Sequence, residues 1–273
     1  MPVLNSPVMP RRSGFPFLDD PTGVIAFAHR GGAYHPEIEG LENTLAAFRH
    51  ARDLGYRYLE TDVHATRDGV LLAFHDTVLD RVTDQQGEIS RMTAAEVRRA
   101  VIGGRESVPT LARLFEEFPD GRFNIDLKSA GAVRPLVEFI EAREAHDRVL
   151  VGSFSPRSLN LFRRLSRGRV ATSAHPLEVA AYLLLPSGRL ADLVTRGRPQ
   201  ALQVPHKRGP LTVAGARLIA RAHAAGKQVH VWTVDDPAEM RELIGRGVDG
   251  LMTDRTDILR DVLRECGAWR EQS

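Results

Sequence analysis

The sequence predicts an α/β fold, a (β/α)8 (TIM) barrel with a small insertion after its second strand. Short apolar runs typical of buried strands alternate with segments of helical periodicity along nearly the whole chain. The strand-like runs number eight, and 273 residues suit a single barrel of this kind. A doubly wound parallel sheet is the alternative that the same alternation leaves open.

The predicted strands and helices alternate. The first strand, residues 24–28, precedes a helix over residues 43–55, in which Leu45, Phe48 and Ala51 recur at helical spacing. The remaining strands are expected at residues 58–63, 122–127, 149–154, 170–174, 201–205, 228–234 and 250–253. The remaining helices are expected at residues 108–118, 133–145, 155–166, 177–185, 212–226, 236–247 and 256–266. This repetition places the carboxyl ends of all the strands at one mouth of the barrel.

The chain is predicted to be one domain over residues 1–273, with a barrel core at about 24–263 and an N-terminal extension over residues 1–20. One interval, residues 65–107, is predicted to be the insertion. It contains an extra strand-like run, VLLAFH, and a short helix, TAAEVRRA, for which Thr93 is the expected cap. An insertion after a strand emerges at the carboxyl-end face of a barrel, where the active sites of such barrels lie.

The composition excludes several classes of protein. Basic and acidic residues number 37 and 35, a formal net charge of +2, which gives no electrostatic reason to expect a nucleic-acid partner. The single cysteine, Cys266, rules out an internal disulfide and a zinc site of the CxxC type. The first 20 residues lack the apolar stretch of a signal peptide, so a cytoplasmic location is expected.

The longest apolar patch, VAAYLLLP at residues 179–186, is far too short to cross a bilayer, so no transmembrane segment is expected. A buried helix is the favoured interpretation of this patch. Transient contact with a membrane surface is the alternative.

Two acidic residues in the second predicted strand carry the first functional signal. Glu60 and Asp62 are two positions apart, so both side chains project from the same face of the strand. Two carboxylates on one face repel each other unless a positive charge lies between them. Asp126, on the third strand, would complete an all-oxygen set of ligands, which suits Mg²⁺ or Ca²⁺ better than zinc. The alternative is that Arg30 and Lys128 neutralise these carboxylates as ion pairs.

Histidine and basic residues lie at the ends of the predicted strands. His29 follows the first strand and His75 ends the extra strand, which makes them candidates for an acid–base pair, since imidazole titrates near neutrality. For either histidine alone, a structural role is the alternative. Arg30 and Lys128 are candidates for holding an anion, and a guanidinium suits the geometry of a phosphate.

Further positions keep two interpretations each. Asn43 would cap the first helix, bind a ligand, or do both. Trp232, in the seventh strand, would belong to the core or to the wall of a pocket. Gly31 and Gly32 would form a turn with positive φ or bring backbone N–H groups close to an anion.

Seven motifs occur together in the chain, namely AHRGG, ENTLAAF, LETDVHATRDGVLLAFHD, VPTLARLF, NIDLK, VHVWTVDD and GVDGLMTDR. As a set they resemble the glycerophosphodiester phosphodiesterase family, from about Ile25 to about Asp261. The resemblance implies a TIM barrel with a small insertion after strand 2 and a divalent metal ion as cofactor. It also implies hydrolysis of a small-molecule substrate, a glycerophosphodiester, to glycerol 3-phosphate and an alcohol.

The resemblance assigns roles to residues that match the family's motifs. It implies that His29 and His75 form the acid–base pair and that Glu60 and Asp62 bind the metal. Asp126 stands where the family usually has glutamate, which is longer by one methylene. A water molecule that bridges Asp126 to the metal is therefore the alternative to direct ligation.

The same resemblance extends to the substrate. It implies that Arg30 and Lys128 contact the phosphate. Glu42 and Asn43 match positions at the edge of the site, and Trp232 matches an aromatic residue that lines the substrate pocket.

Two other functions compete with this one. A phospholipase D-like member of the same barrel group would hydrolyse lysophospholipids or sphingolipids and would carry a large hydrophobic mouth. The insertion segment VLDRVTDQQGEISRMT is mostly polar, which argues against such a mouth. A catalytically inactive barrel that serves as a binding module is the other alternative, and the intact His29, His75, Glu60 and Asp62 argue against it.

Overall fold

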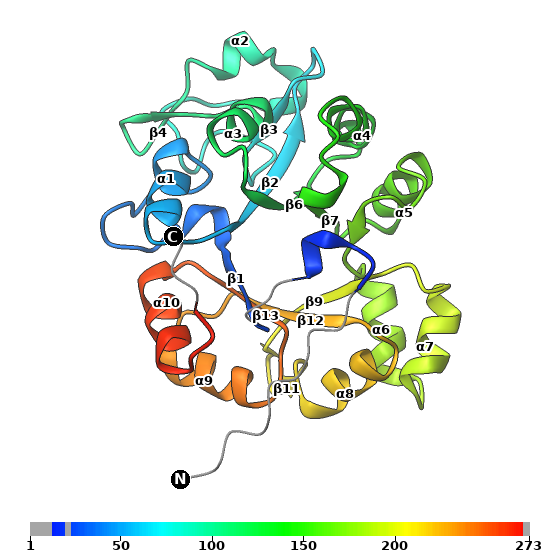
Figure 1. Cartoon of the computed structure of the whole chain (residues 1–273). Coiled ribbons are helices and arrows are strands. Elements are labelled where there is room, and N and C mark those ends of the chain that lie inside the picture. Colours follow the sequence, from blue (N-terminus) through cyan, green and yellow to red (C-terminus); the bar gives the residue numbers. More distant parts are fainter. Residues whose placement is uncertain (1–12, 20–22, 270–273) are drawn as a thin grey trace.

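The structure, a computed structural model, describes residues 13–19 and 23–269. Eight parallel strands in this part of the chain form a nearly closed barrel with helices around it (Figure 1). In chain order these strands are β1 (Ile25–Ala28), β2 (Tyr58–Ala65), β6 (Arg122–Leu127), β7 (Val149–Gly152), β8 (Ala171–Thr172), β9 (Ala201–Pro205), β12 (Gln228–Trp232) and β13 (Gly250–Thr253). The predicted TIM barrel is confirmed, and the doubly wound alternative is wrong.

The barrel closes between its fifth and sixth strands. The hydrogen-bonded order runs β8-β7-β6-β2-β1-β13-β12-β9, which leaves β8 and β9 at the two ends. A parallel bridge joins Ser173 to Ala201, and the N–H of Ala174 donates to the carbonyl of Ala201 at 2.8 Å. This seam is narrow because β8 is only two residues long.

Helices connect the strands and cover the outside of the barrel (Figure 1). They are α1 (Leu45–Asp53), α3 (Leu111–Glu117), α4 (Val133–Ala142), α5 (Pro156–Leu165), α6 (Pro176–Leu184), α7 (Gly188–Thr195), α8 (Ala216–Ala224), α9 (Pro237–Gly245) and α10 (Thr256–Glu265). Of these, the sequence pattern does not predict α7, which begins at a glycine. Packing requires Gly188, since a Cβ there would lie 1.9 Å from the carbonyl oxygen of Arg221 on α8. No helix of the described ranges combines the length and apolar character that crossing a membrane requires.

The barrel interior contains neutral polar side chains that satisfy one another. Gln203 donates to Asn124 Oδ1 at 3.1 Å and lies 3.3 Å from His230 Nδ1. His230 Nε2 lies 2.9 Å from Gln228 Oε1. Burial lowers the pKa of His230 to about 4, so this imidazole is neutral at pH 7. The network therefore fills the barrel without bringing charge into it.

The amino-end mouth of the barrel is closed by the chain segment that precedes β1. The 3₁₀ turn η1 (Pro16–Leu18) inserts Phe17 and Leu18 among the first residues of the strands, where both are buried. The ring of Phe17 meets that of Tyr58 edge to face, with centroids 5.3 Å apart. Arg122 donates to the carbonyl of Phe17 at 3.1 Å. The described part of the predicted N-terminal extension thus belongs to the hydrophobic core.

The insertion after β2 contains the predicted strand and helix. β3 (Leu71–Ala73) pairs antiparallel with β2, and Thr93 caps α2 (Ala94–Val97) through a reciprocal capping box with Glu96. The short strands β4 (Val101–Ile102) and β5 (Glu106–Ser107) form a hairpin. The insertion encloses a separate apolar cluster that includes Leu72, Phe74, Leu79, Ile89, Val97 and Ile102.

We expect Phe17→Ala to lower the free energy of unfolding by about 3–5 kcal/mol, because it leaves a cavity among the aromatic rings that close the barrel. Urea denaturation followed by far-UV circular dichroism measures the change. The control is Leu211→Ala on an exposed surface hairpin, which should change the free energy of unfolding by less than about 0.5 kcal/mol. Equal effects of the two variants would mean that the segment does not belong to the core.

Candidate active site

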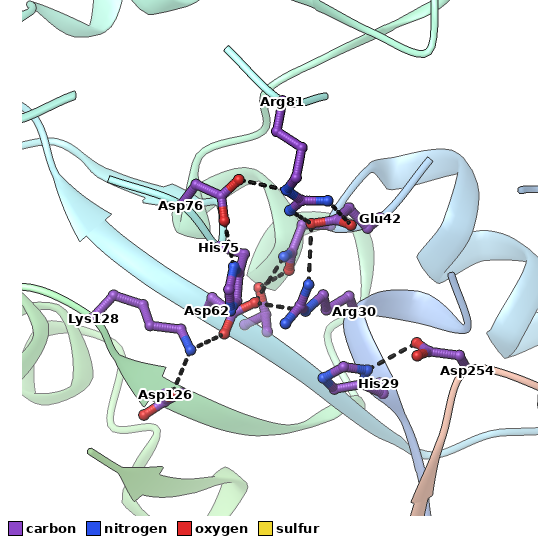
Figure 2. Close-up of polar contacts among 12 residues, drawn as sticks. His29, Arg30, Glu42, Asp62, His75, Asp76, Arg81, Asp126, Lys128 and Asp254 are labelled. Carbon is purple, nitrogen blue, oxygen red and sulfur yellow. Dashed lines mark hydrogen bonds and ion pairs between the residues drawn. The ribbon is translucent and has the colours of Figure 1, made fainter. Parts of the chain in front are cut away.

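The residues singled out from the sequence occupy the ends of neighbouring strands. His29 and Arg30 follow β1, Glu60 and Asp62 lie in β2, His75 follows β3, and Asp126 and Lys128 lie at the end of β6. Because β1, β2 and β6 are adjacent in the sheet, these side chains meet at the carboxyl-end mouth. Figure 2 labels all of them except Glu60. Trp232 ends β12, which is separated from β1 by β13.

A tight turn after β1 holds Arg30 against the carboxylates of β2. Arg30 has a left-handed backbone with φ of 49°, and Gly31 and Gly32 follow with φ of 89° and 91°. A Cβ on Gly31 would lie 2.7 Å from the Cβ of Ala47, so only glycine fits there. The predicted turn with positive φ is confirmed. It directs the N–H of Arg30 to Glu60 Oε2, to which it donates at 3.0 Å.

Glu60 and Asp62 are both buried but have different partners. Asp62 lies 3.2 Å from Arg30 Nε and 3.0 Å from Lys128 Nζ. Burial alone would raise the pKa of Asp62, but Lys128 and Arg30 outweigh it and hold this pKa below its usual value. The nearest basic side chain to the Glu60 carboxylate is His29, whose Nε2 lies 3.9 Å away. Burial and the charge of Asp62 raise the pKa of Glu60 to about 7.

Lys128 stands between two carboxylates (Figure 2). Its Nζ lies 3.0 Å from Asp62 Oδ1 and 2.8 Å from Asp126 Oδ2. Burial raises the pKa of Asp126, although Lys128 partly offsets this effect. The ion pairs that the sequence offered as an alternative to metal binding therefore exist in the structure.

The carboxylates are not already arranged as a complete set of metal ligands. Among the described residues, no group of three His, Cys, Asp or Glu side chains is arranged to hold a metal ion. The donor chemistry at Glu60 and Asp62 nevertheless fits a hard divalent cation, because both are buried carboxylates on one strand face. Burial, and after it the charge of Asp62, raise the pKa of Glu60 to about 7, so the ionised form of Glu60 is compensated less well than that of Asp62. Asp126 fits less well as a direct ligand, because Lys128 lies between it and Asp62.

His29 is held by Asp254, which is not among the site residues predicted from the sequence. His29 Nδ1 lies 2.8 Å from Asp254 Oδ1, and Asp254 directly follows β13. Burial lowers the pKa of His29, but Glu60 and Asp254 more than offset it, so the net pKa is raised. Asp235 fixes Asp254 by accepting its backbone N–H at 2.8 Å. The sequence signal for Asp254 is its place at the end of the eighth strand, in the motif GVDGLMTDR.

His75 is tied to the rest of the site by a chain of charged residues (Figure 2). Its Nδ1 lies 2.6 Å from Asp76 Oδ1, and Asp76 Oδ2 accepts a hydrogen bond from Arg81 at 2.6 Å. Arg81 also forms a bidentate pair with Glu42 at 2.6 and 2.9 Å. Glu42 in turn accepts a hydrogen bond from Arg30 at 3.2 Å. Of the residues in this chain of contacts, Glu42 is expected at the site from its motif, whereas Asp76 and Arg81 are not.

His64 supports the same region from β2. Its Nε2 lies 3.1 Å from the backbone carbonyl of His75. A carbonyl oxygen only accepts hydrogen bonds, so Nε2 of His64 carries the proton. Burial lowers the pKa of His64, which keeps its imidazole neutral.

Asn43 orients Asp62 and does not cap α1. Its Nδ2 donates to Asp62 Oδ2 at 3.0 Å, and its Oδ1 accepts a hydrogen bond from Thr61 at 2.8 Å. The predicted capping role is wrong by one residue, since Thr44 caps α1 and accepts the N–H of Ala47 at 3.2 Å. The physical reason is the backbone, because Asn43 has φ of 59° whereas a capping residue adopts an extended conformation.

Trp232 lies on the other side of the mouth and is half-buried. It packs against the apolar cluster inside the barrel. Its ring meets that of Phe154 edge to face, with centroids 5.9 Å apart, and Phe154 is 62% exposed. Trp232 therefore has core contacts on one side and a solvent-facing aromatic neighbour on the other.

Comparison with known proteins identifies the family. The sequence profile described as "Glycerophosphoryl diester phosphodiesterase family" matches residues 29–258. The chain belongs to this family. A relative from Mycobacterium tuberculosis, "Probable glycerophosphodiester phosphodiesterase 2", is 43% identical over 249 residues, which cover 90% of this chain and 93% of the relative. The resemblance drawn from the motifs is confirmed, and the chain is a phosphoric diester hydrolase.

Solved structures of this family share the fold of the phosphodiesterase. The glycerophosphodiester phosphodiesterase from Thermotoga maritima superimposes with a TM-score of 0.70 and 26% identity, over 88% of this chain and 98% of that one. A phosphodiesterase from Oleispira antarctica, solved in complex with the product sn-glycerol-3-phosphate, gives a TM-score of 0.74 and 22% identity, over 88% and 96% of the two chains.

We expect Glu60→Gln to stabilise this phosphodiesterase at about pH 8 in metal-free buffer, by about 3 kcal/mol. The pKa of Glu60 is raised from 4.5 to about 7, and a raised carboxyl pKa costs stability only where the group is ionised. The gain should therefore be absent below pH 4.5 and complete above pH 7. Urea denaturation across this range measures it.

The matched control for this experiment is Asp62→Asn, on the same strand face. The pKa of Asp62 is lowered, so its ionised form stabilises the fold, and Asp62→Asn should lower the free energy of unfolding at about pH 8. Destabilisation by both variants at that pH would contradict the assignment of less well compensated charge to Glu60.

Proposed function

We propose that the chain hydrolyses glycerophosphodiesters to glycerol 3-phosphate and an alcohol, with His29 and His75 as the acid–base pair. One observation carries the proposal. Two histidines, each hydrogen-bonded through Nδ1 to its own carboxylate, flank a cluster that holds Arg30 and Lys128 beside buried carboxylates. The family supports the reaction, and the product bound by the Oleispira antarctica phosphodiesterase supports the substrate class.

Arg30 and Lys128 are proposed to bind the phosphate. Arg30 Nε lies 3.2 Å from Asp62 Oδ2 and its Nη1 donates to Glu42 at 3.2 Å, so two carboxylates hold the guanidinium in place at the mouth. Both cations lie against Asp62, which fixes their positions before a substrate arrives. A pre-positioned guanidinium and ammonium stabilise charge that develops on a phosphate without reorganising during the reaction.

Glu60 and Asp62 are proposed to hold a divalent cation, Mg²⁺ or Ca²⁺, with Asp126 contributing directly or through a water molecule. Such a cation supplies neutralisation of the negative charge on the phosphate oxygens. Asn43 donates to Asp62 and so restrains the carboxylate that the cation would share with Lys128. Glu42 and Trp232 are proposed to line the edge of the substrate site.

His29 is proposed as the general base. Its Nδ1 donates to Asp254, which leaves Nε2 as the atom that takes the proton from the attacking oxygen. The raised pKa of His29 makes the imidazole a stronger acceptor of that proton. The attacking oxygen belongs to water or to the 2-hydroxyl of the glycerol, and the second case gives a cyclic phosphate first.

His75 is proposed as the general acid. Its Nδ1 is paired with Asp76, so Nε2 is the atom that gives a proton to the departing alcohol. Arg81 holds Asp76 from the other side, and its link to Glu42 fixes His75 relative to the rest of the site. His29 thus acts on the attacking oxygen, and His75 acts on the oxygen of the departing alcohol.

A phospholipase D-like activity on lysophospholipids is the second candidate, and the apolar side chains around the mouth favour it. Tyr34 follows β1, Phe154 follows β7, and Leu211 belongs to the hairpin of β10 (Lys207–Arg208) and β11 (Leu211–Thr212) after β9. All three are exposed. Release of choline from glycerophosphocholine and from lysophosphatidylcholine, each with and without EDTA, distinguishes the two candidates. Release from neither substrate would identify an inactive barrel.

We expect Glu60→Gln and Asp62→Asn each to lower kcat/KM on glycerophosphocholine by at least about 10³-fold, because each removes a ligand charge but little volume. Asp126→Glu should stay within about tenfold of the wild type, since it restores the residue usual in the family. Rates measured in Mg²⁺, in Ca²⁺ and in EDTA test this, with thermal shifts on adding each metal as a second readout. Near-normal rates of both neutralised variants in EDTA would contradict the metal assignment.

The two histidines differ in their expected response to the leaving group. His75→Ala should lose about 10²–10⁴-fold in kcat/KM on glycerophosphocholine but far less on bis(p-nitrophenyl) phosphate, whose leaving group is stable as an anion. His29→Ala should be impaired on both substrates, because the attacking oxygen still requires deprotonation. The control is His146→Ala in the 3₁₀ turn η5 (His146–Arg148), which precedes β7 and so lies away from the carboxyl-end mouth; it should match the wild type. Equal losses of His75→Ala on both substrates would count against its role as the acid.

A further inference from the structure

The outer face of the α6–α7 hairpin exposes large apolar side chains. Leu177, Leu184, Leu190, Leu193 and Val194 are exposed there. The exposed fraction reaches 80% for Leu184 and 73% for Leu193. The buried helix favoured for VAAYLLLP is therefore wrong in part, because α6 buries Tyr182 but turns Leu184 to solvent. In Figure 1 this hairpin lies at the outer edge of the molecule.

Contacts on the inner side fix the hairpin to the rest of the barrel, so within the described residues its position does not depend on a partner at its outer face. Tyr182 on α6 donates to Asp192 on α7 at 3.2 Å. Arg221 on α8 donates to the carbonyls of Tyr182 and Leu183 at 3.1 and 2.7 Å, which satisfies the last turn of α6. Gly188 lets α7 approach α8 closely.

The charge around this apolar face is positive. The acidic side chains of residues 176–198 are Glu178 and Asp192. Both are engaged inward, Glu178 with Arg163 at 2.7 Å and Asp192 with Lys227 at 3.0 Å. The hairpin also carries the arginines Arg189, Arg196 and Arg198, all exposed. Among the described residues, Arg189 and Arg196 have no ion-pair partner, so their charge is available to an external anion.

We propose that the α6–α7 face binds peripherally to a bilayer that contains anionic lipids. Exposed leucines beside unpaired arginines match such a surface, since apolar side chains insert at the headgroup boundary while the cations meet lipid phosphates. A second copy of the chain is a poorer occupant, because a two-fold interface would bring Arg189 and Arg196 toward their own copies. The proposal does not depend on the catalytic assignments.

The test is flotation of the full chain with vesicles of phosphatidylglycerol and phosphatidylcholine, compared with vesicles of phosphatidylcholine alone. The wild type should bind the anionic vesicles and lose affinity as salt is added. Leu184→Ser combined with Leu193→Ser should weaken binding at least about tenfold. Arg189→Gln combined with Arg196→Gln should weaken it roughly thirtyfold, about fivefold for each arginine.

Matched controls change the same chemistry elsewhere. Val78→Ser and the pair Arg98→Gln with Arg99→Gln, all at exposed positions outside the α6–α7 hairpin, should bind vesicles like the wild type. The hairpin variants should keep the wild-type rate on soluble glycerophosphocholine or, if the chain lacks that activity, the wild-type melting temperature.

Three results would overturn the proposal. The first is that the wild type does not float with anionic vesicles. The second is equal binding by the hairpin variants and the wild type. The third is a dimer in light scattering that Leu184→Ser combined with Leu193→Ser dissolves, which would identify a second copy of the chain as the occupant.

Discussion

The site depends on one constraint, the burial of Glu60 and Asp62 on a single face of β2. Ionised carboxylates inside a barrel are costly unless positive charge or hydrogen bonds compensate them. Arg30 and Lys128 compensate Asp62, whereas Glu60 keeps a raised pKa. The left-handed turn after β1 follows from the same constraint, because it brings both the backbone N–H and the side chain of Arg30 to these carboxylates. Stability alone does not explain this arrangement, because buried carboxylates are costly, and ionisable groups with shifted pKa values are typical of functional sites.

The two histidines meet this cluster from different parts of the structure. His29 stands on the barrel, with Asp254 at the end of the last strand. His75 belongs to the insertion, whose apolar cluster is separate from the main core. Arg81 therefore has a particular importance, since its bonds to Asp76 and Glu42 join the insertion to the loop before α1. The position of His75 relative to His29 thus depends on the contacts that hold the separately packed insertion against the barrel.

Much of the arrangement of the site residues could be predicted from local sequence, because the barrel topology determines where the strand ends lie. Once the strands are recognised, parallel topology brings their carboxyl ends together, so polar residues such as Asp62 and Asp126 become neighbours. The roles of Asp254 and Arg81 did not follow, because their partners lie 225 and 39 residues away, and no periodicity encodes such pairs. The insertion of Phe17 into the amino end of the barrel is equally non-local. The Asn43 error arose because Asn43 and Thr44 are both good caps, and only the backbone conformation chooses between them.

The position of the α6–α7 hairpin in the topology explains why its outer face is unconstrained. The hairpin connects β8 to β9 and so spans the narrow seam at which the barrel closes. Arg163 on α5 reinforces this seam, because it pairs with Glu178 on α6 and donates to Thr172 on β8 at 2.9 Å. The inward-facing residues of the hairpin therefore stabilise the seam between β8 and β9. Its outward leucine and arginine side chains make none of these contacts, and an exposed apolar patch of this kind is typical of an interaction surface.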